Sequence, residues 1–342
     1  MPADLTAGIE FNQDKLEDNM WGYHRTVDQK VNIGSAFFQN EWKNEHWGFL
    51  IGGRLDKHNL IDHVIFSPRA NLRYNPTENI NLRFSYSSGF RAPQAFDEDL
   101  HVENVGGNVA MVELADNLKE ERSQSLSASA DIYHRFGAFQ VNFLVEGFYT
   151  KLSDVFALTD GEIVDGILTR TRYNAPGARV MGLTLEGKMA YLTKFQLQAG
   201  ITLQQSHYSE PHVWNKEAPA VKKMMRTPNT YGYFTATYTP IKPLSIALSG
   251  TYTGSMLVPH EPVPGFLEKP ITVNTKDFFD IGLKAAYDFK LYKSMNLQVN
   301  AGVQNIFNAY QNDFDKGADR DSGYIYGPSL PRSFFAGVKI SY

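Results

Sequence analysis

The stretch INLRFSYS, residues 80–87, places an apolar residue at every second position and a polar residue at the positions between. Because the side chains of a β-strand point alternately to opposite faces, this pattern predicts a strand with one apolar and one polar face. The same period recurs in residues 125–132, 244–249 and 297–304. No comparable stretch repeats at the helical period of about 3.6 residues. The chain is therefore expected to be all-β.

The composition narrows the class of protein. Of the 342 residues, 42% are hydrophobic, which excludes a disordered chain, and the net charge of −4 comes with no basic cluster, which argues against a nucleic-acid partner. There is no cysteine, so disulfides, thiolate metal sites and cysteine nucleophiles are excluded. The first residues show no signal-peptide pattern, so we expect either a cytosolic protein or a mature or truncated piece of an exported one.

Strand length favours a membrane. The expected strands 119–135, 138–158, 273–290 and 294–311 are much longer than the roughly 5–6 residues usual in soluble sheets. No apolar run approaches the roughly 18 residues of a membrane-spanning helix, but a strand crosses hydrocarbon in about 9–11 residues. A soluble sandwich or propeller would show the same alternation, and extraction of a folded monomer without detergent would identify one.

Connections alternate between short polar turns and long irregular segments. The long segments are expected at 20–29, 58–63, 94–118, 159–166, 209–226, 259–272 and 312–328. An antiparallel meander with tight turns at one rim and long loops at the other is typical of bacterial outer-membrane barrels. We count about fourteen strands, with 167–192 taken as one long strand that is irregular at 174–177.

The chain ends in SFFAGVKISY, in mid-alternation and on an aromatic residue. This ending resembles the C-terminal signal that the outer-membrane barrel assembly machinery reads, with Gly337, Ile340 and Tyr342 in the expected places. An ordinary last strand is the alternative.

Several stretches together resemble one family, the TonB-dependent receptors of Gram-negative outer membranes, with features of Bacteroidota members. The stretches are a strand pair ending in GFRAP (89–93), LKEERS (118–123) opening the next strand, NAPGARVMGLTLE (174–186) and GVQNIFNAYQ (302–311). The resemblance covers nearly all of the chain, and the motifs are specific jointly rather than singly.

The resemblance implies a transmembrane antiparallel β-barrel domain over residues 1–342. Members have about 22 strands, so about fourteen strands imply a C-terminal part that lacks the plug domain, the first strands and the signal peptide. The implied function is uptake of a scarce bulky nutrient complex, ferric siderophore first and haem or cobalamin next. The implied partners are outer-membrane lipid, the barrel assembly machinery and, through the missing plug, the TonB complex.

Ligand contacts are expected in the outer loops, because loops on a rigid scaffold often carry binding. The segment 94–118 follows an outward-running strand, and its candidates are Phe90, Arg91, Asp97, Asp99 and His101. We expect Arg91 to pair with Asp97, Glu98 or Asp99. A solvated acidic loop without ligand is the alternative.

Further candidates lie in 207–214. His207 and His212 flank Glu210, but no pair of histidines shows tight metal-ligand spacing, so neither a metal site nor a resident cofactor is predicted. Aromatic residues could form a vestibule for a planar or catecholate ligand or belong to an interfacial belt, and these are Tyr208, Trp214, Phe266, Tyr324 and Tyr326. No catalytic constellation is present, so an enzyme is not expected. The main alternative function is a self-contained passive pore.

Overall fold

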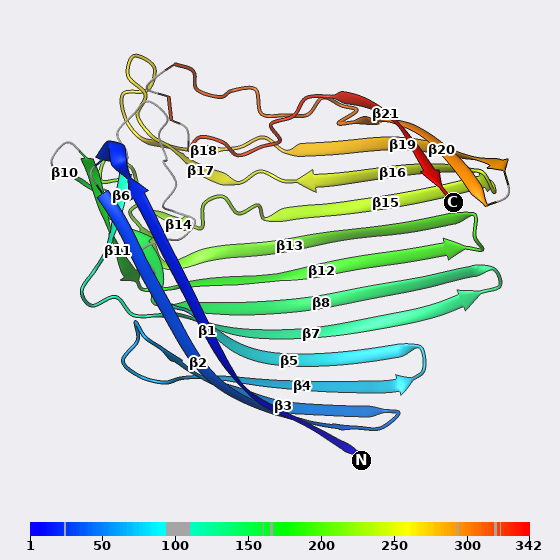
Figure 1. Cartoon of the computed structure of the whole chain (residues 1–342), viewed down its shortest axis with the longest axis horizontal. Helices are drawn as coiled ribbons and strands as arrows, with labels where there is room; N and C mark the ends of the chain where they lie inside the picture. The colour runs from blue at the N-terminus through cyan, green and yellow to red at the C-terminus, as the bar shows by residue number, and fades with distance from the viewer. Residues whose placement is uncertain are drawn as a thin grey trace.

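The structure is a computed structural model that describes residues 1–23, 25–93, 110–159, 161–164, 167–292, 294–317, 320–321 and 323–342. Its main feature is one curved antiparallel sheet whose strands follow one another along the chain as a meander (Figure 1). No helix of the described residues is long and apolar enough to cross a bilayer.

The main path of this sheet has fourteen strands, which confirms the predicted number. In spatial order they are β1 (Ala3–Met20), β2 (Arg25–Lys43), β3 (Trp47–His58), β4 (Ile65–Thr77), β5 (Ile80–Arg91), β7 (Glu121–Phe136), β8 (Phe139–Ser153), β12 (Ala178–Tyr191), β13 (Phe195–His212), β15 (Thr230–Ile241), β16 (Leu244–Thr253), β19 (Phe278–Tyr292), β20 (Met295–Gln304) and β21 (Ser333–Ser341). The short β14 (Val221–Lys223) pairs with β13. Within the described residues, β1 pairs only with β2 and β21 only with β20, so both are edge strands.

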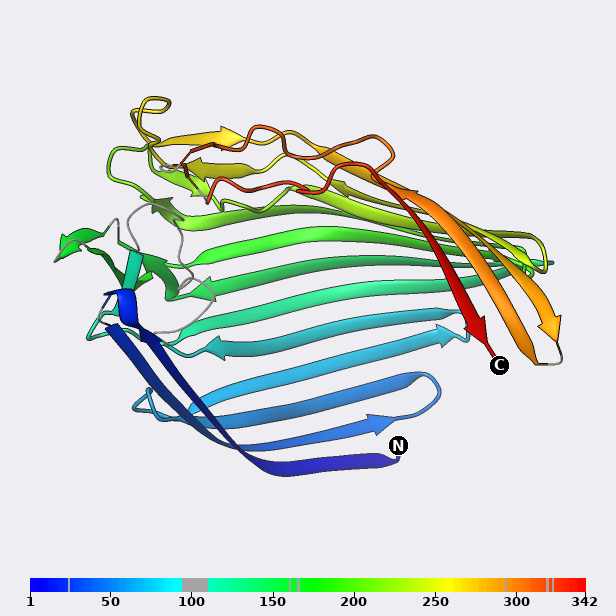
Figure 2. The ribbon, with the colours of Figure 1, turned by 45° about the horizontal axis from the view of Figure 1, so that its top comes forward.

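Two small sheets lie beside the long connections. One contains β6 (Ala110–Leu114), β9 (Val155–Leu158), β10 (Glu162–Val164) and β11 (Ile167–Ala175), and the other is the hairpin of β17 (Leu257–His260) and β18 (Ile271–Asn274). Both lie at the end of the main sheet opposite its short turns (Figures 1 and 2). This end is the predicted rim of large loops, and we call it the outer rim.

The strand registers place apolar residues opposite apolar residues, and polar residues opposite polar ones, on neighbouring strands of the main sheet. On one face the pairings join Phe84 to Leu72 and Ala128, Ala130 to Val145, and Leu185 to Ile201. The opposite face is polar and is held by side-chain hydrogen bonds, such as Ser125 to Thr150 at 2.9 Å and Thr184 to Thr202 at 3.0 Å. The sheet therefore has one continuous apolar face and one continuous polar face, as the alternation predicts.

The apolar face has the height of a bilayer core. Beside the short turns it begins with a cross-strand aromatic row, made of Phe136, Phe139, Tyr191, Phe195 and Tyr238. Towards the outer rim its last row contains Leu126, Tyr149 and Met181. Ten residues of β7 separate Phe136 from Leu126, and ten residues at about 3.4 Å each, tilted by about 45°, rise about 24 Å. Outer-membrane barrels have an apolar band about 25 Å tall between aromatic girdles.

Several predicted boundaries were wrong. Residues 20–29 are not an irregular loop, because β1 and β2 remain paired as far as Met20 and Arg25 around a 3-10 turn (Trp21–Tyr23). The segment 167–192 is two strands in different sheets. The chain breaks at Gly177, whose φ of +130° suits only glycine and where a Cβ would lie 2.5 Å from the carbonyl oxygen of Leu152.

Further corrections concern strand ends. The predicted strand 273–290 is divided between β18, which ends at Asn274, and β19, which begins at Phe278. Asp154, with φ of +54°, divides the predicted strand 138–158 into β8 and β9. The predicted strand 294–311 ends at Gln304. There Asn305 adopts a φ of +50°, a conformation that asparagine tolerates better than most residues. Asp154 and Asn305 are turn residues, but the apolar-polar alternation continues around them, so the sequence pattern does not reveal that the strands end there.

An arginine at Ala130, near the middle of the apolar band on β7, should destabilise the protein in lipid vesicles by about 2–4 kcal/mol, because a charge at mid-bilayer is costly. Ser129→Arg, on the polar face one residue away, is the matched control and should cost much less. Urea unfolding in vesicles measures both variants. Equal costs would show that the two faces do not meet different solvents.

Candidate functional site

The outer rim carries the predicted ligand-contacting strand end at the end of β5. Phe90 packs against a small buried cluster of Ile61, Ile65 and Ala92, so its role in the structure is to hold the base of the loop. Arg91 lies on the polar face, opposite Glu121 of β7, with a guanidinium nitrogen 3.7 Å from the Glu121 carboxylate. The two neighbours in sequence thus have different surroundings.

Arg91 is part of a cluster of cations around one aromatic ring. Its guanidinium carbon lies 4.8 Å from the centroid of the Phe156 ring, and that of Arg172 lies 5.8 Å from it. Arg172 is only 1% exposed, whereas the Arg91 side chain is 51% exposed. Glu121 also accepts a hydrogen bond from the backbone amide of Phe156 at 3.0 Å, which anchors the backbone at that residue. Arg91 is therefore a half-exposed cation that shares the Phe156 ring with the buried guanidinium of Arg172.

Three predicted ligand residues, Asp97, Asp99 and His101, lie outside the described residues. The predicted pairing of Arg91 with Asp97, Glu98 or Asp99 stays a prediction for the same reason. Among the described residues, Glu121 is the carboxylate beside Arg91.

The candidates in 207–214 lie on β13 and the segment after it. Tyr208 and His212 have ring centroids 4.8 Å apart, whereas His207 pairs in register with Lys223 of β14. The indole nitrogen of Trp214 is buried and has no hydrogen-bond partner among the described residues. The structure does not bring His207 and His212 together with a third metal-ligating group in the part of the chain that it describes.

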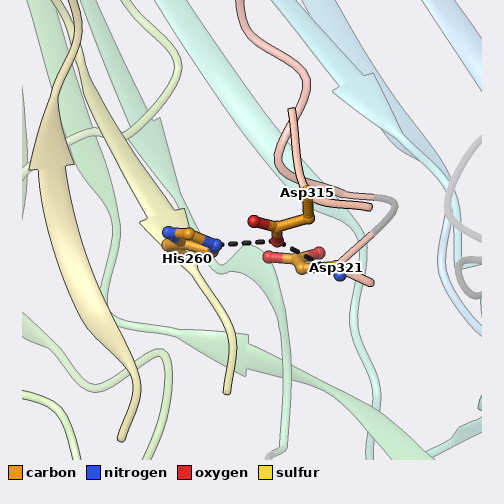
Figure 3. A group of neighbouring side chains, drawn as sticks. All are labelled: His260, Asp315 and Asp321. Atoms are coloured by element: carbon orange, nitrogen blue, oxygen red, sulfur yellow. Dashed lines mark hydrogen bonds and ion pairs between the residues drawn. The ribbon is translucent and has the colours of Figure 1, made fainter. Parts of the chain in front are cut away.

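A different cluster could hold a metal ion. His260 at the end of β17 and Asp315 and Asp321 of the 305–332 connection place their ligand atoms within 4.8 Å of one another (Figure 3). His260 Nε2 lies 2.8 Å from Asp315 Oδ2, and Asp321 accepts hydrogen bonds from the backbone amides of Glu261 and Gly323, both at 2.8 Å. These bonds fasten the long connection to the hairpin of β17 and β18. Asp315 and Asp321 were not predicted, because 55 residues separate Asp315 from His260 and no local spacing signals the contact.

Two of the predicted aromatic residues belong to the same loop assembly. Tyr324 stacks on His260 at a centroid distance of 3.8 Å and packs in a buried cluster with Met256 and Val258. Burial and a 2.6 Å hydrogen bond to Asp313 raise the pKa of Tyr326 above its ordinary value. Phe266, by contrast, is exposed. Tyr324 therefore forms the core of the loop and belongs to neither a ligand vestibule nor an interfacial belt.

A charged network reinforces the rim near Arg91. Arg122 and His63 both lie against the Glu120 carboxylate, at 2.6 and 3.0 Å. Burial of Glu120 acts to raise its pKa, but hydrogen bonds from Arg122 and His63 outweigh burial, so the pKa lies below its ordinary value. The carboxylate is consequently charged at neutral pH and joins the 58–63 connection to the start of β7.

Two cavities lie in different surroundings, one at the outer rim and one on the apolar face of the main sheet. A polar cavity of about 540 Å³ lies at the outer rim between β9, β10 and β11 and the segment that carries Trp214. A larger groove of about 880 Å³ lies on the apolar face, with Phe84, Leu126, Gly147 and Leu183 among its lining. Because this groove opens on the side that meets lipid, a water-borne nutrient would not reach it.

Asparagines in two of the resembling motifs tie the rim together. Asn174 donates hydrogen bonds to the carbonyl oxygens of Lys119 and Asp154, at 3.0 and 2.8 Å, and accepts one from the Lys119 amide at 2.8 Å. Asn305 makes similar bonds to Ala309 and Leu330. Each amide side chain satisfies backbone groups that leave the regular ladder.

Gly337, Ile340 and Tyr342 lie at the free edge of the sheet. Gly337 is opposite Asn300 and Ile340 opposite Leu297, and Ile340 and Tyr342 are exposed. Their role as an assembly signal stays a prediction.

Replacing Asn174 with alanine should lower the free energy of unfolding by about 1–3 kcal/mol, because three backbone groups lose their partner. Denaturant unfolding in detergent measures the change. Asn296→Ala, which removes one exposed bond of 3.3 Å beside a short turn, is the control and should be close to neutral. A loss no larger than that of the control would show that Asn174 does not hold the rim.

Comparisons with known proteins agree with this architecture. The model of the family "TonB dependent receptor-like, beta-barrel" matches residues 2–306. None of the curated proteins matches the chain in sequence.

Among solved structures, a variant of the ferric enterobactin receptor PfeA from Pseudomonas aeruginosa is similar with a TM-score of 0.67 at 19% identity, over 99% of this chain and 51% of that one. The siderophore receptor PirA from Acinetobacter baumannii gives 0.69 at 16% identity, over 98% and 52%. The FrpB iron transporter from Neisseria meningitidis gives 0.65 at 16%, over 98% and 52%. At these identities the likeness shows the fold alone, and the chain spans about half the length of each of these structures.

The apolar band, the meander and the family match over most of the chain lead to one conclusion: the chain belongs to the family of TonB-dependent receptor β-barrels.

Proposed function

We propose that this chain is the barrel part of an outer-membrane receptor that takes up a scarce bulky nutrient complex, with ferric siderophore as the first ligand class and haem or cobalamin as the next. It would act in the outer membrane of a Gram-negative bacterium, with energy delivered through TonB to a plug. The family and its similar solved structures support this proposal, since those structures are described as siderophore receptors and an iron transporter.

The observation that carries the choice of ligand is the Arg91 cluster. Ferric complexes of catecholate siderophores are anionic and bear flat rings, and a guanidinium binds both anions and aromatic faces. Arg91 offers a half-exposed cation at the outer rim, beside the Phe156 ring that the buried Arg172 also approaches. Glu121 on one side fixes the orientation of Arg91. This arrangement suits a bulky anion that arrives from outside the cell.

Completeness of the transporter is part of the proposal. The chain covers about half of the similar structures, and β1 and β21 each have one unpaired side among the described strands. Edges of this kind are not tolerated in lipid. We propose that further strands and a plug, as longer family members possess, complete the functional receptor.

The alternative of a self-contained passive pore would require β1 to pair with β21. The structure instead pairs these strands only with β2 and β20 in the part that it describes. No specific observation therefore favours the pore.

Arg91→Ala should weaken binding of ferric enterobactin, used as a probe, by about tenfold or more, because a hydrogen bond between a guanidinium and an anionic ligand contributes roughly 1.5–3 kcal/mol. Quenching of tryptophan fluorescence in detergent measures the affinity. Arg135→Ala, at the short-turn end of β7, removes the same charge and should leave binding unchanged. Binding of haem or cobalamin with higher affinity than ferric enterobactin would contradict the siderophore assignment, and equal affinity of the two variants would contradict the role of Arg91.

A further inference from the structure

A row of basic side chains crosses four strands on the outward, apolar side of the sheet. In register, Gln124 of β7 faces Lys151 of β8, Lys151 faces Arg179 of β12, Arg179 faces His207 of β13, and His207 faces Lys223 of β14. Gln124, Lys151 and Arg179 each lie two residues closer to the outer rim than the last row of the apolar face. His207 lies two residues beyond Gln205, which continues that row on β13. Since two residues of a tilted strand rise about 5 Å, this basic row lies at the level of lipid headgroups.

The row is electrostatically unfavourable on its own. Lys151 and Arg179 are direct cross-strand neighbours, and like charges in that position destabilise a sheet. On the same face, the positions two residues before and after them carry no acid: they are Tyr149, Ser153, Gly177 and Met181. Among the described residues, no carboxylate forms an ion pair with Lys151, Arg179 or Lys223. An anion from outside the chain would relieve the repulsion.

The apolar groove of about 880 Å³ lies directly below this basic row. Tyr149, Met181 and Gln205, which line the groove, each precede or follow a residue of the row by two positions on the same strand. Its floor is open at Gly147, where a Cβ would meet nothing within 4 Å. A cationic site above an apolar groove has the shape and chemistry of a site for an anionic lipid.

We propose that this surface binds a membrane lipid whose headgroup carries phosphate, with the phosphate at Lys151 and Arg179 and an acyl chain in the groove at Gly147. The site faces away from the lumen, so it is independent of the nutrient that the receptor takes up. Phosphate gives the row its missing counter-charge, and each Lys or Arg near an anionic membrane surface contributes favourably to binding. The bound lipid would hold β8, β12 and β13 together at the rim where β9 and β11 leave the sheet.

Native mass spectrometry of the full chain in detergent tests the proposal. The probe is a bisphosphorylated glucosamine lipid, with the dephosphorylated form of the same lipid and inorganic phosphate as separate arms. The wild-type chain should retain the phosphorylated lipid. The double variant Lys151→Gln with Arg179→Gln should bind it with an affinity at least about tenfold lower. Gly147→Leu should also weaken binding, because its side chain fills the groove.

Matched controls separate this site from general effects. Lys284→Gln with Lys339→Gln removes the same charge from the polar face, and Gly187→Leu adds the same side chain to the apolar face where a Cβ also meets nothing within 4 Å. Both should bind as the wild type does. Equal binding of the phosphorylated and dephosphorylated lipids, equal binding by all variants, or full displacement of the lipid by inorganic phosphate at equal concentration would each overturn the proposal.

Discussion

The structure depends on one constraint: in a strand that crosses hydrocarbon, every backbone N–H and C=O must be paired and every second side chain must be apolar. The long meander meets the first condition for the strands between its two edge strands, β1 and β21, by pairing each of them on both sides. The second appears as an unbroken apolar face from the aromatic row of Phe136 to the row of Leu126. A shift of one residue in any register would turn a whole set of apolar side chains towards the lumen, which makes the registers strongly specified.

The same constraint explains where irregular structure occurs. Irregular backbone is found in the long connections at the outer rim, where side chains replace the ladder as hydrogen-bond partners. Asn174 and Asn305 perform this task for the connections next to β11 and β20, and Asp321 does so for the 305–332 segment. The rim is therefore a built layer with small sheets and a buried cluster of its own, on which Arg91 is held in a defined position.

The fold was largely predictable because alternation is a local signal repeated along the chain. Residues 80–87 already contain it, and the number of strands in the main sheet followed from counting such segments. The rim was less predictable. Alternation continues from β8 into β9, so the break at Asp154 left no trace in the pattern. The sequence predicts the irregularity at 174–177, but as a bulge within one strand and not as the break between β11 and β12. His260, Asp315 and Tyr324 meet only through the return of a long connection, which no local spacing reveals. Arg91 was predicted from the sequence as a ligand contact, whereas its ring partner Phe156 lies 65 residues further along the chain and was not part of that prediction.

The two faces of the sheet also have different functional consequences. The polar face ends at the rim in the cluster of Arg91, which suits a ligand from outside, and the apolar face ends in the basic row of Lys151 and Arg179, which suits a lipid headgroup. Both sites follow from the alternation of side chains along a strand, which places one residue on the polar face and the next on the apolar face.

The central claim, that the apolar face meets lipid and the polar face meets water, is tested most directly by spin-label accessibility along β7. The chain contains no cysteine, so single cysteines at residues 124–133 can be labelled without background. In lipid vesicles, the account predicts high oxygen accessibility at Leu126, Ala128 and Ala130 and high accessibility to a water-soluble nickel chelate at Ser125, Ser127 and Ser129. Accessibility without this period of two, or with the two phases exchanged, would contradict it.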